Sequence, residues 1–160
     1  MSYPLPNYRF SVSLDPVDVY VPPTAPNGPP VIGVGSFCEV AGLSGELEVI
    51  AHREGGQNAF VHQLPVRHTW GRLVLKKGVV RDLVLWTWFN EGLTGSLGAR
   101  RDGAVFLHDA AGELALAWEF RAGMAAKWTG PDLSAREGAI AIETLEIVHQ
   151  GLRQVNLGGA

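Results

Sequence analysis

The sequence predicts a mainly β protein, an antiparallel barrel or sandwich that carries one α-helix. Three observations support this fold class. Residues 8–14 alternate apolar and polar side chains with period two, residues 104–121 have the pattern of a β-hairpin, and residues 81–93 have the composition of a helix. At 160 residues the chain has the length of a single domain, residues 1–160, and can bury a core without disulfides or metal ions.

The first half of the chain alternates short strands with irregular segments. After the strand at 8–14, residues 15–36 contain six prolines, so we expect a Pro-rich loop insertion there rather than a paired strand. Residues 37–40 and 46–52 are the next expected strands. Residues 53–68 contain adjacent glycines and a proline together with apolar side chains, so we expect a long loop with apolar anchors.

A strand at 69–77 is expected to lead into the helix at 81–93. The apolar residues of this helix occupy most of its circumference, which indicates burial on more than one side. Trp86 and Trp88 lie about 200° apart around a helix, so they cannot both face the same core. We therefore expect one of them to contact either an intramolecular loop or a neighbouring subunit.

The second half of the chain contains the hairpin at 104–121, with its turn at 109–112. An irregular stretch is expected at 124–138, followed by a final strand at 139–149. That strand is apolar on both faces, which predicts that both faces are covered. We expect residues 158–160 to form a flexible tail.

Composition excludes several classes of protein. The single cysteine, Cys38, rules out an internal disulfide and multi-cysteine zinc sites, and we expect its side chain to be a small buried hydrophobe. A net charge of -3 lacks the basic footprint of specific nucleic-acid recognition. The start of the chain has no signal-peptide pattern and no apolar run approaches the length of a membrane anchor, so we expect synthesis in the cytoplasm.

The sequence contains no catalytic, cofactor-binding or metal-binding signature. Its five histidines have neither the spacing nor the carboxylate partners of a metal or hydrolase motif. We therefore predict no enzyme activity and no cofactor. Only 18% of the residues are charged, whereas soluble domains typically carry about 25%, which indicates that part of the outer surface is covered.

The order of short segments along the chain resembles the tail tube proteins of contractile phages and related contractile injection systems, which are akin to the tube protein of type VI secretion. The segments are residues 4–10 (PLPNYRF), 37–43 (FCEVAGL), 53–58 (REGGQN) with 64–65, 73–79 (LVLKKGV) before 85–88 (LWTW), 127–133 (KWTGPDL) and 141–149 (AIETLEIVH). The resemblance extends over nearly the whole chain.

The resemblance implies a structural role. Six copies would form a ring, the rings would stack into a rigid inner tube, and a contracting sheath would drive that tube through a target envelope. It further implies sheath and baseplate or spike proteins as partners, possible protein cargo in the lumen, and incorporation into a phage tail or tail-like particle that can be released from the cell. Neighbouring protomers would share strands to close a common barrel.

In similar proteins the loop corresponding to residues 53–68 reaches toward neighbouring subunits. We therefore expect a subunit interface at the following residues: Glu54, Gly55, Gly56, Asn58, Phe60, Trp86 and Trp88. Residues 60–67 also resemble the variant found in tube initiators, the rings that join the spike to the tube, so an initiator ring is the alternative function. Two more distant alternatives are a small-ligand-binding β-barrel, which requires a closed monomeric barrel with an apolar cavity, and a hydrolase.

Overall fold

A computed structural model describes residues 3–14, 37–56, 58–79, 81, 83–95 and 100–158. The insertion expected at 15–36 lies outside the described residues, as do residues 159 and 160 of the expected tail. Gly158, the first residue of that tail, is described, and its N–H donates to the carbonyl of Ala115 over 3.0 Å.

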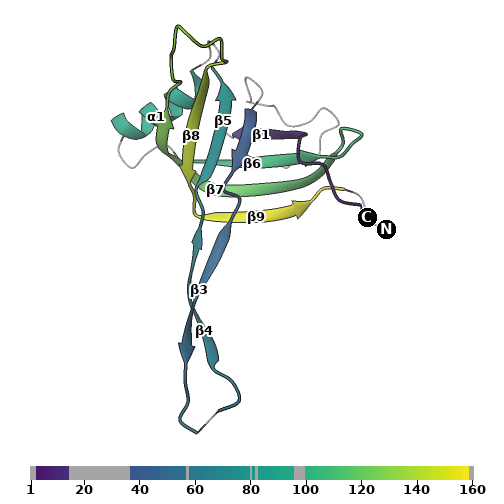
Figure 1. The fold of residues 1–160 in the computed structure, drawn as a ribbon, viewed down its shortest axis with the longest axis vertical. Helices are drawn as coiled ribbons and strands as arrows, with labels where there is room; N and C mark the ends of the chain where they lie inside the picture. The colour runs from purple at the N-terminus through teal and green to yellow at the C-terminus, as the bar shows by residue number, and fades with distance from the viewer. Residues whose placement is uncertain are drawn as a thin grey trace.

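The described chain is mainly β with one helix, and its strands pair antiparallel, so the predicted fold class is confirmed at that level (Figure 1). In chain order the elements are β1 (Phe10–Leu14), β2 (Phe37–Ala41), β3 (Gly45–His52), β4 (His62–Trp70), β5 (Leu73–Gly78), α1 (Val84–Thr94), β6 (Arg100–His108), β7 (Leu114–Thr129), β8 (Ile142–Val148) and β9 (Gly151–Asn156).

Strand β7 organises the body of the molecule because it pairs with three other strands. β6 lies along one edge of β7, while β9 and then β8 follow one another along the other edge. The change of partner falls at Ala122, whose φ of 49° is left-handed and whose N–H donates to Asp102 Oδ1 over 2.8 Å. This local irregularity bends β7, and in Figure 1 β6, β7 and β9 run across the body while β5 and β8 run steeply to them.

The main sheet has the order β1-β6-β7-β8-β5-β2, with β9 beside β7. Its core forms where the two directions of strands cross, and α1 contributes two fully buried side chains, Leu85 and Trp88. The other buried members of this core are Val12, Leu14, Leu73, Leu75, Val105, Phe120, Ala125, Leu145 and Ile147. Among the described strands, β1 and β2 stand at opposite ends of the sheet and do not pair with each other, so one copy does not close a barrel.

A charged pair is buried in the body. Lys77 on β5 and Glu143 on β8 are cross-strand neighbours, with Nζ and Oε1 3.7 Å apart and side chains 1% and 9% exposed. Trp128 on β7 donates its indole N–H to Glu143 Oε2 over 3.2 Å. Because buried charges are tolerated only when paired and hydrogen-bonded, this cluster ties three strands in one register.

The structure corrects several sequence-based expectations. Residues 62–68 are not loop, because they form most of β4, and Gly71 and Arg72 separate that strand from β5. β7 continues through Thr129 into the stretch expected to be irregular, and β9 was not predicted. Cys38 is exposed rather than buried, since β2 is the last strand of the sheet and its side chain points out of the core.

Replacing Trp88 with alanine should lower the free energy of unfolding by about 3 to 5 kcal/mol, because the indole is fully buried in the core. Trp86, which is 38% exposed on the same helix, is the matched control, and Trp86→Ala should cost clearly less. Urea denaturation followed by circular dichroism measures both losses. A Trp86→Ala loss as large as that of Trp88→Ala would contradict this assignment of the core.

Candidate functional site

Strands β3 and β4 form a two-stranded arm, residues 45–70, that projects away from the body (Figure 1). The two strands pair with each other and form a sheet separate from the main one. Every residue of β3 is exposed, and on β4 only His62 is partly covered. The arm therefore has the backbone pairing of a hairpin without a core of its own.

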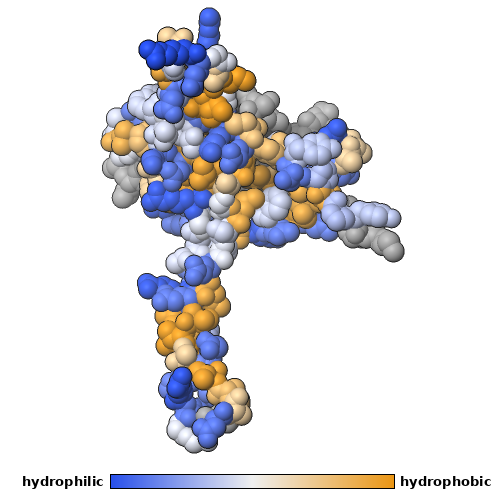
Figure 2. Space-filling model, in the orientation of Figure 1, coloured by the Kyte–Doolittle hydropathy of each residue, from blue (hydrophilic) through white to orange (hydrophobic). Residues whose placement is uncertain are grey.

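The surface of the arm is unusually apolar for a segment that faces solvent, as Figure 2 shows along the projecting part. Its large hydrophobic side chains are between 37% and 57% exposed. They are Leu47, Val49, Ile50, Phe60, Val61, Leu64, Val66 and Trp70. Because an isolated two-stranded hairpin is only marginally stable in water, and contiguous exposed apolar surface marks contact sites, the arm is the strongest candidate for the functional surface.

The two faces of the arm differ near the body. Successive residues of a strand alternate between faces, and cross-strand partners share a face. One face carries Glu46 opposite Thr69 and then Glu48, which is ion-paired with Arg67. The opposite face carries Leu47 in this half of the arm. Near the body, therefore, one face carries carboxylates and an ion pair, and the other carries Leu47 opposite His68.

Directly beyond a β-bulge, both faces carry an apolar cross-strand pair. The register shifts between Glu48 and Val49. Past this point Val49 pairs with Pro65 on one face, and Ile50 pairs with Leu64 on the other. The distal half of the arm thus presents hydrophobic side chains in two opposite directions.

The tip of the arm collects five of the residues that the sequence predicted for a subunit interface. Glu54, Gly55, Gly56, Asn58 and Phe60 are all exposed there. Glu54 Oε2 lies 3.5 Å from Nε2 of His62, and the Phe60 ring meets the His62 ring edge-on with centroids 4.9 Å apart. Gly56 has a φ of 91°, so the turn uses a conformation that favours glycine.

The two tryptophans of the predicted interface lie on α1, in the body rather than on the arm. Trp86 is 38% exposed and packs edge-on against Trp128, with ring centroids 4.8 Å apart. Trp88 is fully buried, and the guanidinium carbon of Arg101 lies 5.5 Å from its ring centroid. In one copy, therefore, the indole of Trp88 is enclosed by its own chain, whereas that of Trp86 keeps exposed surface.

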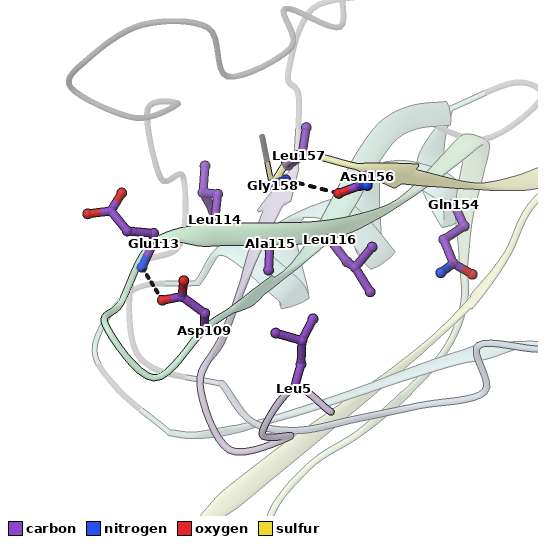
Figure 3. A pocket seen from close by; sticks show the side chains of 10 residues that line it. All are labelled: Leu5, Asp109, Glu113, Leu114, Ala115, Leu116, Gln154, Asn156, Leu157 and Gly158. Atoms are coloured by element: carbon purple, nitrogen blue, oxygen red, sulfur yellow. Dashed lines mark hydrogen bonds between the residues drawn. The ribbon is translucent and has the colours of Figure 1, made fainter. Parts of the chain in front are cut away.

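A second candidate is an open hollow of about 830 Å³ at the end of the body where β9 finishes (Figure 3). Asp109 lies on its rim, but its carboxylate accepts the N–H groups of Ala111 and Glu113 and so holds the β6–β7 turn. Asn156 similarly accepts the N–H of Gly158. The side chains of Asp109 and Asn156 thus stabilise local backbone, and the open shape of the hollow does not match the enclosed apolar cavity of a ligand-binding barrel.

Neither metal chemistry nor a membrane span has a structural basis in the described residues. Histidine, cysteine, aspartate and glutamate side chains do not gather there in any group of three or more that could hold a metal ion. Among the same residues, no helix combines the length and the apolar character needed to cross a bilayer.

Comparison with known proteins gives a consistent result. The family model described as T4-like virus tail tube protein gp19 matches residues 6–153. The chain is similar to a chain in the 6-fold symmetrised cryo-EM structure of the anti-feeding prophage baseplate, with 28% identity, 97% of each chain covered and a TM-score of 0.79. No curated protein matches the chain in sequence.

Two further solved structures share the fold. A chain in the extended sheath–tube complex of the extracellular contractile injection system PVC is 24% identical, with 97% of this chain and 93% of that chain covered and a TM-score of 0.76. Hcp1 from Flavobacterium johnsoniae is 13% identical, with 91% and 93% covered and a TM-score of 0.57.

The apolar side chains of the arm should contribute little to the stability of a single copy. Ile50→Thr and Leu64→Thr keep β-compatible side chains and should each change the free energy of unfolding by less than about 0.5 kcal/mol, because both residues are largely exposed. Chemical denaturation of dilute protein measures the change. A loss of several kcal/mol would mean that the arm packs against the body of its own chain.

Proposed function

This chain belongs to the family of T4-like virus tail tube proteins, and we propose on that premise that its copies assemble into stacked hexameric rings that form the inner tube of a contractile injection system or phage tail. As a tail tube protein it is a structural protein and not an enzyme. In this proposal, residues 1–160 form a single tube domain. The 6-fold symmetry of the similar anti-feeding prophage structure supports the number of copies in a ring.

The observation that carries the proposal is the apolar arm. A single copy leaves its hydrophobic side chains in water, whereas a contact with neighbouring copies would remove them from it. Contacts through the tip would use Glu54, Gly55, Gly56, Asn58 and Phe60. In the distal half, Ile50 and Val49 point to opposite faces, so that half of the arm would lie between two neighbouring surfaces.

Open sheet edges support a second kind of contact between copies. β1 and β2 end the main sheet, and each offers unpaired backbone groups on its outer side within the described part of the chain. Ile142 on β8 is 42% exposed, so the second apolar face of this strand is also incompletely covered in one copy. Strand pairing between neighbours would satisfy such edges and close a shared barrel around the ring.

The proposed tube would also contact proteins other than its own copies. The similar chain in the PVC complex comes from a sheath–tube structure, and the similar chain in the anti-feeding prophage comes from a baseplate. We accordingly assign sheath and baseplate or spike proteins as partners of this chain, and protein cargo as the possible content of its lumen. The exposed indole edge of Trp86 is available for one of these contacts. The chain would be made in the cytoplasm and leave the cell within an extracellular particle.

The second candidate is the initiator ring at the baseplate end of the tube. The observation in its favour is the 28% identity with the chain from the baseplate structure, against 24% with the chain from the sheath–tube complex. Cryo-electron microscopy of the native particle, with this chain located by a bound antibody fragment, separates the two. Label along the whole tube supports the tube subunit, and label confined to one end supports the initiator.

Ile50→Lys should prevent or strongly reduce assembly while the free chain stays folded, because it would bury an unpaired ammonium group in a contact between copies. Thr69→Lys is the matched control. It introduces the same charge on the charged part of the arm, directly opposite Glu46, where cross-strand attraction is favourable. Negative-stain microscopy and sedimentation velocity measure rings and stacked tubes. Normal tubes from Ile50→Lys would remove the arm as a contact between copies.

A further inference from the structure

We propose that His149 sets the direction of the arm relative to the body, and that the arm is held in its assembly orientation before any neighbour binds. The inference rests on the proposed function of the arm as a contact between copies. It concerns a different property, namely how a hairpin that pairs only with itself keeps one direction in space. A hairpin free to swing would have to lose that freedom on assembly, at a cost in affinity.

His149 lies in the short turn between β8 and β9, beside the point where the arm leaves the body. Gln150, the next residue, donates its N–H to the carbonyl of Arg121 over 2.9 Å and so holds this turn on β7. The Nε2 atom of His149 lies 3.1 Å from the carbonyl oxygen of Gly71, the first residue after the arm. Because a carbonyl only accepts, Nε2 is the nitrogen that carries the proton.

The other ring nitrogen, Nδ1, is buried and has no hydrogen-bond partner among the described residues. Within the described residues, the imidazole is therefore oriented by its hydrogen bond to the carbonyl of Gly71. Gly71 directly follows the last residue of β4, so this hydrogen bond links the orientation of the imidazole to the end of the arm.

The ring of His149 also joins the arm to the core through aromatic contacts. Its centroid lies 6.1 Å from that of Trp70, the last residue of β4, and 6.2 Å from that of Phe120 on β7. Phe120 is only 1% exposed, so it is part of the fixed core. Trp70, His149 and Phe120 form a continuous column that leads from the base of the arm into the body.

Two glycines allow close packing where the arm leaves the body. A Cβ at Gly45 would lie 2.8 Å from Cζ3 of Trp70, and a Cβ at Gly71 would lie 2.0 Å from Oγ of Ser44. The N–H of Gly71 donates to the carbonyl of Ser44 over 3.0 Å. Both strands of the arm are therefore packed against each other at the exit, and the aromatic column fixes the direction of the pair.

Distance measurements between two spin labels test the proposal. The exposed Cys38 on β2 provides a label on the body. Gly55→Cys provides one at the tip, where an added Cβ meets nothing within 4 Å. The labelled chain is mixed with an excess of unlabelled chain, so that only distances within one copy are read. The parent protein should give one narrow distance distribution.

His149→Leu removes the ring and the donor to Gly71, and it should broaden the distance distribution by about twofold or more. Gln150→Ala is the matched control in the same exposed turn, and it should leave the distribution narrow. Gly71→Ala keeps His149 and the carbonyl that it contacts, but places a Cβ 2.0 Å from Oγ of Ser44, so it perturbs the exit of the arm separately and should also broaden the distribution. His149→Gln, which removes the ring but keeps a polar side chain, decides the question should His149→Leu not fold.

Unlabelled variants then report on assembly. At equal protein concentration, His149→Leu and Gly71→Ala should form rings about tenfold less well than the parent, because an arm without a set direction must be ordered on binding. A narrow distribution in folded His149→Leu, or in His149→Gln should His149→Leu not fold, would overturn the assignment of His149. A broad distribution with parental ring formation would overturn the role of arm direction in assembly. Neither result concerns Ile50→Lys, whose normal assembly would instead remove the arm contact itself.

Discussion

The structure of this protein depends on one constraint, which is that the chain carries more apolar surface than one copy can bury. In the body, two sets of crossing strands and the inner face of α1 bury their apolar side chains against one another. The arm has no such solution, because a two-stranded ribbon leaves both faces in solvent unless another molecule covers them. The low charged fraction, 18%, agrees with this excess of apolar surface.

The body supplies the rigidity that an arm of this kind requires. β7 binds one strand along one edge and two along the other, and Ala122 bends it where the partner changes. The buried pair of Lys77 and Glu143 favours the observed register of β5 against β8, because a shift by one residue would turn Lys77 to the opposite face of the sheet and break the pair.

The sequence predicted the parts of the fold in which burial follows a simple period. The strand at β1 alternates with period two, and the hairpin of β6 and β7 has alternation on both sides of a turn. The helix was predicted from its end signals, an aspartate at residue 82 near its start and glycines at residues 92 and 95 near its end. β4 was mistaken for a loop because its residues are exposed on both faces, so burial imposes no alternation, and because Pro65 and a bulge interrupt it. Trp86 and Trp88 were placed correctly on a helix, but spacing alone does not say which of the two is buried.

By itself the sequence determined the fold class, the absence of a recognisable chemical site and the family resemblance, because all three depend on local patterns and on the order of short segments. Only the tertiary structure decided where the residues predicted for an interface lie in the molecule. It placed the glycine-rich segment at the tip of a projecting arm, enclosed Trp88 in the core, and set His149 between Trp70 and Phe120. Those outcomes depend on contacts between residues far apart in the chain, which no local period records.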